Sequence, residues 1–191
     1  MGASRSAPDA SGAFLSGFGL LPPVFVTLRR FGPVALIPAA WITAGAATVG
    51  FLRTDGMLIA HLVMVGFIAF FLVTGWRRMA DGALRAWRAV LVVGLGLTLT
   101  GVAGFIGPVS GPTLRGVSLV GWMVVPAAGL AYTARELPGA AVVYAGGAAM
   151  ALLGAAVFVW TLASAGQPLV WPSVGLVAAG HTVGIVDAAR R

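Results

Sequence analysis

The sequence predicts an all-α protein that crosses a membrane several times. Of its 191 residues, 59% are hydrophobic and only 9% are charged, whereas soluble domains carry roughly 25% charged residues. The apolar residues are gathered in runs of about 20, the length that an α-helix needs to cross the hydrocarbon core of a bilayer. This composition excludes a disordered chain, a nucleic-acid-binding domain and an ordinary soluble enzyme.

Six apolar runs are long enough to span a membrane, and the linkers between them are short. Short linkers make consecutive helices antiparallel neighbours. We therefore expect a polytopic transmembrane bundle of six helices with short loops over residues 33–191. The expected spans are Pro33–Leu52, Met57–Gly75, Ala86–Gly107, Gly116–Ala134, Gly139–Ser164 and Leu169–Ala188.

Residues 1–32 are expected to form an N-terminal tail and an interfacial or re-entrant segment. Met1–Ser11 is small and polar, whereas Gly12–Leu28 is apolar but broken by Pro22-Pro23. The segment lacks the charged leading region and cleavage site of a signal peptide, so a position at headgroup level is expected. A seventh span over the same residues stays open as the alternative.

The arginines predict the orientation of the bundle. All twelve basic residues are Arg, and only Arg53 and Arg115 fall on the side opposite the N-terminus. Since basic residues are enriched in cytoplasmic loops, we expect an inner-membrane protein with both termini in the cytoplasm. The arginines on the N-terminal side are Arg5, Arg29, Arg30, Arg77, Arg78, Arg85, Arg88, Arg135, Arg190 and Arg191.

Membrane lipids are the expected partners of this basic side. Basic side chains near a membrane surface attract anionic headgroups with about 1 kcal/mol each. The high Arg content is therefore assigned to lipid contact, and no nucleic-acid partner is expected. The residues assigned to headgroup contact are Arg29, Arg30, Arg77, Arg78, Arg85 and Arg88.

Tryptophans near the span ends are typical of interfacial belts. Trp76 and Trp87 flank the basic loop, and Trp122, Trp160 and Trp171 lie towards the other side.

Small residues recur at four-residue spacing in three spans, which lets helix backbones approach closely. We expect internal helix contacts at these stripes, and self-association or contact with other membrane subunits stays open. The stripes are Gly96, Thr100 and Gly104; Gly147, Ala151 and Ala155; Ala141, Ala145 and Ala149; and Gly180, Gly184 and Ala188.

Two prolines raise the hypothesis of an inverted repeat. Pro38 and Pro126 lie inside expected spans, in the matching contexts Ile-Pro-Ala-Ala and Val-Pro-Ala-Ala. Three spans in each half would make the two halves inverted, and inverted repeats with broken helices are typical of transporters. A small transporter of inverted 3+3 architecture is one hypothesis, and chance similarity or mere duplication is the other.

Two histidines, His61 and His181, lie inside the expected spans, and no Asp, Glu or Arg falls deep within any of them. His181 lies roughly 13 Å from the Arg-rich side, and Thr43 and Thr98 reach a similar depth. A neutral His bonded to a Thr or a carbonyl is the simplest expectation, and a ligand contact is the alternative. A cavity shared by the three would favour ligand binding, whereas a core filled by small residues would favour a scaffold or subunit. The candidate ligand-binding residues are His181, Thr98, Thr43 and His61.

His61 and His181 are not expected to act together. His61 lies only about 7 Å below the Arg-poor side, so its depth differs from that of His181 by roughly 10 Å, too much for both rings to ligate one haem. Ligation of haem by His181 alone stays open. Ser118 lies at the membrane edge, so a Ser118–His181 pair, which vaguely resembles the rhomboid protease arrangement, does not match in depth.

Neither a metal site nor a cofactor is expected. Cysteine is absent, and no zinc, calcium, Walker or dinucleotide motif is present. No catalytic residue is identified, and the scarcity of ionisable groups weighs against an enzyme.

The layout resembles a family of small six-helix integral membrane proteins of bacteria and archaea known only as a domain of unknown function. The likeness covers most of Arg30 to Arg191 and rests on Gly66-Phe67, on Pro126 and on the short basic loops. This resemblance implies the fold and adds nothing about mechanism. We expect a non-enzymatic accessory subunit or a binder of a small apolar or lipid-like ligand, with a transporter and an intramembrane enzyme or haem protein using His181 as alternatives.

Overall fold

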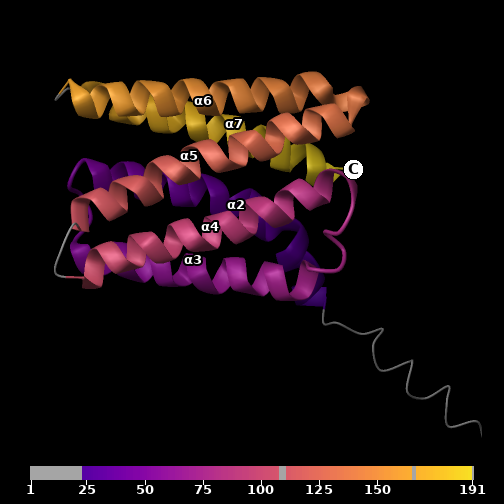
Figure 1. Ribbon diagram of the computed structural model, residues 1–191, viewed down its shortest axis with the longest axis horizontal. Coiled ribbons are helices and arrows are strands. Elements are labelled where there is room, and N and C mark those ends of the chain that lie inside the picture. Colours follow the sequence, from indigo (N-terminus) through magenta and orange to yellow (C-terminus); the bar gives the residue numbers. More distant parts are fainter. Residues whose placement is uncertain (1–22, 108–110, 165–166, 191) are drawn as a thin grey trace, which may run out of the picture.

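The computed structural model describes residues 23–107, 111–164 and 167–190, and these residues form six α-helices and no strand. The helices lie side by side along the long axis of the molecule (Figure 1). The predicted all-α bundle is therefore confirmed. The helices are α2 (Pro23–Thr48), α3 (Thr54–Gly75), α4 (Gly82–Ile106), α5 (Gly111–Glu136), α6 (Ala141–Ala163) and α7 (Val170–Arg190), with short 3-10 turns at Pro138–Ala140 and Gln167–Leu169.

Four of the described helices are long and apolar enough to cross a membrane: α3, α4, α5 and the stretch Pro138–Ala163 that contains α6. In α2, a shorter stretch, Val34–Thr48, is apolar. α7 has 21 residues, which at 1.5 Å per residue cover about 30 Å, the thickness of the hydrocarbon core. α2 and α7 run alongside the other four (Figure 1), so the six described helices form one bundle, of which four are long and apolar enough to cross a membrane.

The first helix begins earlier than the sequence indicates. The first span was expected from Pro33, but α2 starts at Pro23. Proline is tolerated at a helix start because its missing N–H would have no partner there. Residues 23–28, expected in the interfacial segment, therefore continue directly into the first span. The rest of that segment and the tail lie outside the described residues.

The helices do not all pack on their sequence neighbours. From α3 to α7 each helix packs on the next, but α2 packs on α7 and not to a comparable extent on α3. Gly45 of α2 makes room for Trp171 of α7, since a Cβ at this glycine would lie 2.7 Å from the indole ring. The prediction that α2 packs on α3, its neighbour in the sequence, is therefore wrong. Aromatic packing on α7 determines the position of α2 more strongly than the short linker to α3 does.

Close contact between α6 and α7 confirms one pair of small-residue stripes. A Cβ at Gly147 would lie 2.6 Å from the carbonyl oxygen of Gly180, and one at Gly154 would lie 2.6 Å from that of Ser173. Gly147, Ala151 and Ala155 are buried, as are Gly180 and Gly184. The prediction that the other stripe of α6 makes an internal contact is wrong, since Ala145 and Ala149 are exposed. Ala188, the last residue of the expected stripe on α7, is exposed as well.

Of the expected stripe on α4, Gly104 contacts α5, where a Cβ would lie 2.8 Å from the carbonyl oxygen of Gly111. Gly96 has nothing within 4 Å of the position of a Cβ, whereas Gly94 lies under the ring of Trp122. The indole nitrogen of Trp122 donates to Thr98 Oγ1 at 3.0 Å. The interpretation of Trp122 as an interfacial residue is therefore wrong; Trp160 and Trp76 are about half exposed or more, as a belt requires.

The α4–α5 contact contains a local repeat. Trp87 of α4 donates to Thr133 Oγ1 of α5 at 3.1 Å, which is the reverse of the Trp122–Thr98 bond. Both helices carry the same spacing, a Trp, a Gly seven residues later and a Thr four residues after that. In two antiparallel helices this spacing brings each Trp onto the Gly and Thr of the other helix. Two equivalent Trp–Thr hydrogen bonds therefore join α4 and α5.

The inverted repeat of three helices is not confirmed. Under the proposed correspondence, α5 packing on α6 should match α2 packing on α3. The first contact is extensive, whereas the second is weak or absent. The packing therefore gives the repeat no support.

Candidate functional site

His181 lies on α7 at the junction with α2 and α5. Its side chain is 4% exposed, and its ring centroid is 5.6 Å from that of Trp41 on α2, with the rings tilted by 52°. Trp41 and Met123 of α5 belong to the largest cluster of buried apolar residues. The histidine therefore borders the apolar core of the bundle and does not face a loop.

The Nε2 atom of His181 is buried and has no hydrogen-bond partner among the described residues. The ring also lies close to the backbone of Met123 on α5. With its hydrogen on Nδ1, a neutral imidazole presents a bare lone pair at Nε2.

Pro126 lies inside α5 and is buried close to this level. A proline lacks the N–H that would bond to the carbonyl four residues earlier, here that of Trp122. Met123, whose backbone lies near the His181 ring, is the next residue after Trp122.

The other expected ligand residues do not join His181. The hydroxyl of Thr43 donates to the carbonyl of Ala39 in its own helix at 2.8 Å. Thr98 donates to the carbonyl of Gly94 at 2.8 Å and accepts from Trp122. The space beside Gly184, three residues after His181, is filled by Leu130 and Tyr144. His181 is therefore a single polar site between apolar surfaces.

His61 belongs to a separate group of residues. Its Nδ1 lies 2.9 Å from the carbonyl oxygen of Met57, and its ring meets the edge of Phe105 with centroids 5.0 Å apart. A Cβ at Gly101 would lie 2.5 Å from His61 Nε2 and 2.8 Å from Ser118 Oγ. The rejected Ser118–His181 pair is thus absent, and Ser118 lies beside His61 instead, which also comes from the Arg-poor end.

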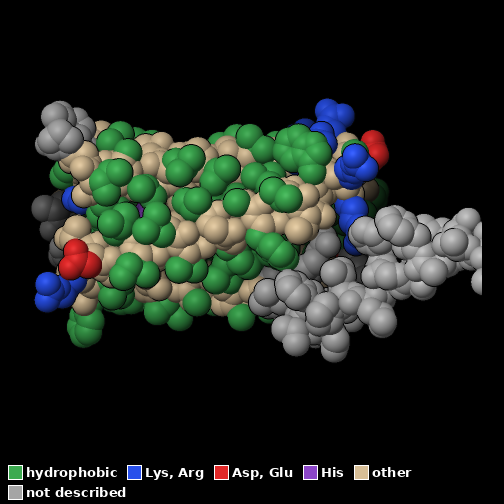
Figure 2. Space-filling view, turned by 90° about the horizontal axis from the view of Figure 1, so that it is seen from below, with side chains coloured by type: hydrophobic (Ala, Val, Ile, Leu, Met, Phe, Trp, Pro, Cys, Tyr) green, Lys and Arg blue, Asp and Glu red, His purple; other side chains and the backbone are tan. Residues whose placement is uncertain are grey.

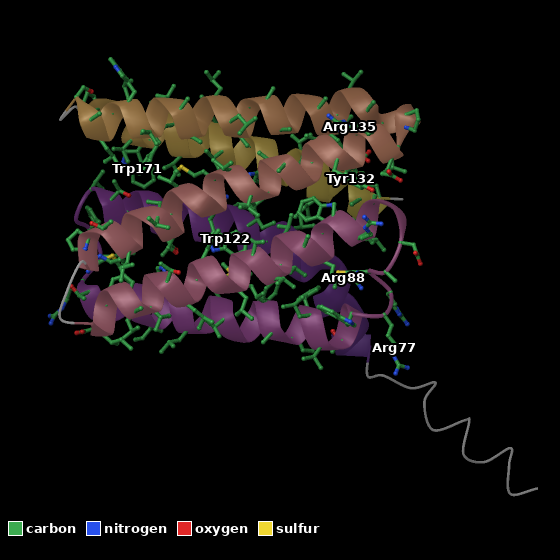
Figure 3. All side chains as sticks on the ribbon, in the orientation of Figure 1. Arg77, Arg88, Trp122, Tyr132, Arg135 and Trp171 are labelled. Atoms are coloured by element: carbon green, nitrogen blue, oxygen red, sulfur yellow. The ribbon has the colours of Figure 1, made fainter. Side chains whose placement is uncertain are left out.

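The charged side chains gather at the two ends of the bundle. Figure 2 shows basic and acidic side chains at the ends and apolar side chains along the length between them. Arg77, Arg88 and Arg135 lie at the same end (Figure 3), and the guanidinium of Arg88 lies 4.9 Å over the ring of Trp76. Arg78 lies in the loop between α3 and α4, and Arg85 lies in the first turn of α4, at the same end. The side chains of Arg29 and Arg30 lie outside the described part.

No group of three or more potential metal ligands from His, Asp and Glu occurs in the described ranges. No protein-family model, curated protein or solved structure matches this chain. The resemblance to the six-helix family therefore stays without further support, and function has to be inferred from the geometry.

Proposed function

We propose that the chain is a multi-pass protein of the cell's inner membrane that binds a small, largely apolar molecule at His181. The observation that carries this proposal is the buried Nε2 atom, which has no partner among the described residues. Leaving a buried polar atom unpaired costs about 1–3 kcal/mol. A ligand that donates one hydrogen bond to this nitrogen would recover that free energy.

The surroundings of the nitrogen define the class of ligand. Trp41 and Met123 are apolar and buried, and Thr43 and Thr98 use their hydroxyls elsewhere. A ligand with a second charged or strongly polar group would lose hydration here without a partner. The best match is an apolar molecule with a single hydroxyl or N–H group.

The orientation of the protein in this proposal follows from its arginines. Among the described residues, eight arginines lie at the end where α2 begins and α7 ends, and only Arg53 and Arg115 lie at the other. Basic residues are enriched on the cytoplasmic side. We therefore place the Arg-rich end and both termini in the cytoplasm, with Arg77, Arg78, Arg85 and Arg88 against anionic headgroups.

The test is mass spectrometry of molecules that co-purify with the protein in mild detergent. The substitution His181→Phe keeps an aromatic ring and removes the lone pair, so it should release a molecule that the wild type retains. Thr43→Val is the matched control, because that hydroxyl bonds only within its own helix. Retention of the same molecule by His181→Phe would contradict the proposal. A Soret band in the purified protein would instead indicate haem on the same nitrogen.

An accessory subunit is the second candidate. It is favoured by the separation of Thr43 and Thr98 from His181 and by the glycine contacts that fill the α6–α7 interface. Co-purification of a stoichiometric second membrane protein, retained in His181→Phe, would support this role over ligand binding.

A further inference from the structure

A second polar cluster lies near the Arg-poor end, where α3, α4 and α5 meet. It consists of His61, Ser118 and Arg115, arranged around the glycine face of α4. It shares no residue with the His181 site.

Gly101 lets two polar side chains of this cluster pack closely against α4. A Cβ there would lie 2.5 Å from His61 Nε2 and 2.8 Å from Ser118 Oγ, so any larger residue would clash with both side chains. The two atoms cannot be further apart than the sum of these distances. Gly101 therefore brings two hydrogen-bonding groups from different helices to one point.

The hydroxyl of Ser118 is not satisfied within its helix. Other helical hydroxyls, including those of Thr43, Thr98 and Thr133, donate to the carbonyl four residues earlier. Ser118 is 2% exposed, yet no hydrogen bond of its hydroxyl is formed with the described residues. Its donor is therefore free for an external group, directed at Gly101.

Arg115 adds an unneutralised positive charge one helical turn nearer the membrane surface. Its Nη1 donates to the carbonyl of Gly104 at 3.3 Å, and its guanidinium lies 5.1 Å from the ring centre of Phe105. Asp55 is the acidic residue of the described chain at this end, and it lies 3.9 Å from Arg53. Arg115 thus keeps most of its donors without a carboxylate to receive them.

Phe105 joins the two parts of the cluster. Its ring contacts both the His61 ring and the Arg115 guanidinium. The neighbours of the cluster residues along the chain are exposed and apolar: Leu62, Ile106 and Val117. A charged group bound here would therefore sit directly beside surface suited to hydrocarbon chains.

We propose that this cluster binds an anionic phospholipid at the Arg-poor end of the bundle. The phosphate lies on Arg115, and an ester carbonyl of the glycerol accepts from Ser118 about one turn, roughly 5 Å, deeper. His61 Nε2, whose other nitrogen faces the Met57 carbonyl, accepts from a hydroxyl or water of the headgroup. The order of charge, ester and chains in a phospholipid matches the order of Arg115, Ser118 and the apolar neighbours.

The experiment is native mass spectrometry of the purified full chain titrated with phosphatidylglycerol. Arg115→Gln should weaken binding about tenfold, the size of a lost charge-assisted hydrogen bond, and Ser118→Ala should weaken it several-fold. Arg53→Gln is the matched control, since Arg53 lies at the same end, is 91% exposed and lies beside an acidic residue; its effect should stay within about twofold.

Three results would overturn the proposal. Equal weakening by Arg53→Gln and Arg115→Gln would mean non-specific attraction of the lipid to positive charge. Equal binding of phosphatidylcholine would remove the requirement for net negative charge. Displacement of the lipid by millimolar inorganic phosphate would indicate a site for a free anion. Circular dichroism and gel filtration of each variant would verify that the bundle is intact.

Discussion

At the scale of single residues, hydroxyl groups decide which side chains stay available for function. Most helical Thr and Ser hydroxyls donate back to their own helix, as Thr74 and Thr161 do. Thr98 and Thr133 also accept from a tryptophan of the facing helix. Among the described residues, His181 Nε2 and the Ser118 hydroxyl form no such bond, and each proposal uses one of these atoms.

The Trp122–Thr98 bond gives a prediction at this scale. Thr98→Val should destabilise the bundle by about 1 kcal/mol, because the part-buried indole N–H of Trp122 loses its acceptor. Thr100→Val should be close to neutral, since Thr100 bonds only to the carbonyl of Gly96 in its own helix. Unfolding in mixed micelles measures both. Equal stability of the two variants would show that the Trp122–Thr98 hydrogen bond does not contribute to the free energy of unfolding.

At the scale of helices, run length predicted the elements well, and side-chain pattern predicted their contacts less well. Helices α3 to α7 begin and end within a few residues of the expected spans. The start of α2 was predicted ten residues too late, because the proline pair was interpreted as an interruption of the helix. Proline is equally suited to the first position of a helix. Small-residue spacing alone could not say which stripe faces a neighbour, since Gly94 and Gly96 of α4 look alike in sequence but only Gly94 is buried.

The α6–α7 interface gives the prediction for this scale. Gly180→Ala should lower the free energy of unfolding by about 1–3 kcal/mol, because the new methyl group would meet backbone of Gly147 and Ala151. Gly175→Ala lies on the same helix with nothing within 4 Å, so it should be neutral or stabilising by up to about 1 kcal/mol. Similar destabilisation by both would mean that α6 and α7 are not in close contact.

At the scale of the whole molecule, the arginine distribution and the helix order describe one polarised bundle. From Pro23 to Arg190 the described chain forms six helices and returns to the end where α2 begins (Figure 1), and that end carries most of its arginines. Figure 2 shows charged side chains at the ends of the bundle. Sequence alone indicated this polarity because charge and run length are local properties. The packing of α2 on α7 and the contact of His61 and Ser118 with Gly101 could not be predicted from the sequence. Both depend on how helices that are distant in the sequence are rotated relative to one another.

Cysteine labelling in intact cells tests the central claim most directly, since the natural chain contains no cysteine. Ala80 lies in the α3–α4 loop at the Arg-rich end, and Phe51 lies in the α2–α3 linker at the other end, 86% exposed. A membrane-impermeant maleimide should modify Phe51→Cys in intact cells and Ala80→Cys only after permeabilisation. Modification of Ala80→Cys in intact cells, with none at Phe51→Cys, would contradict the proposed orientation of the membrane bundle.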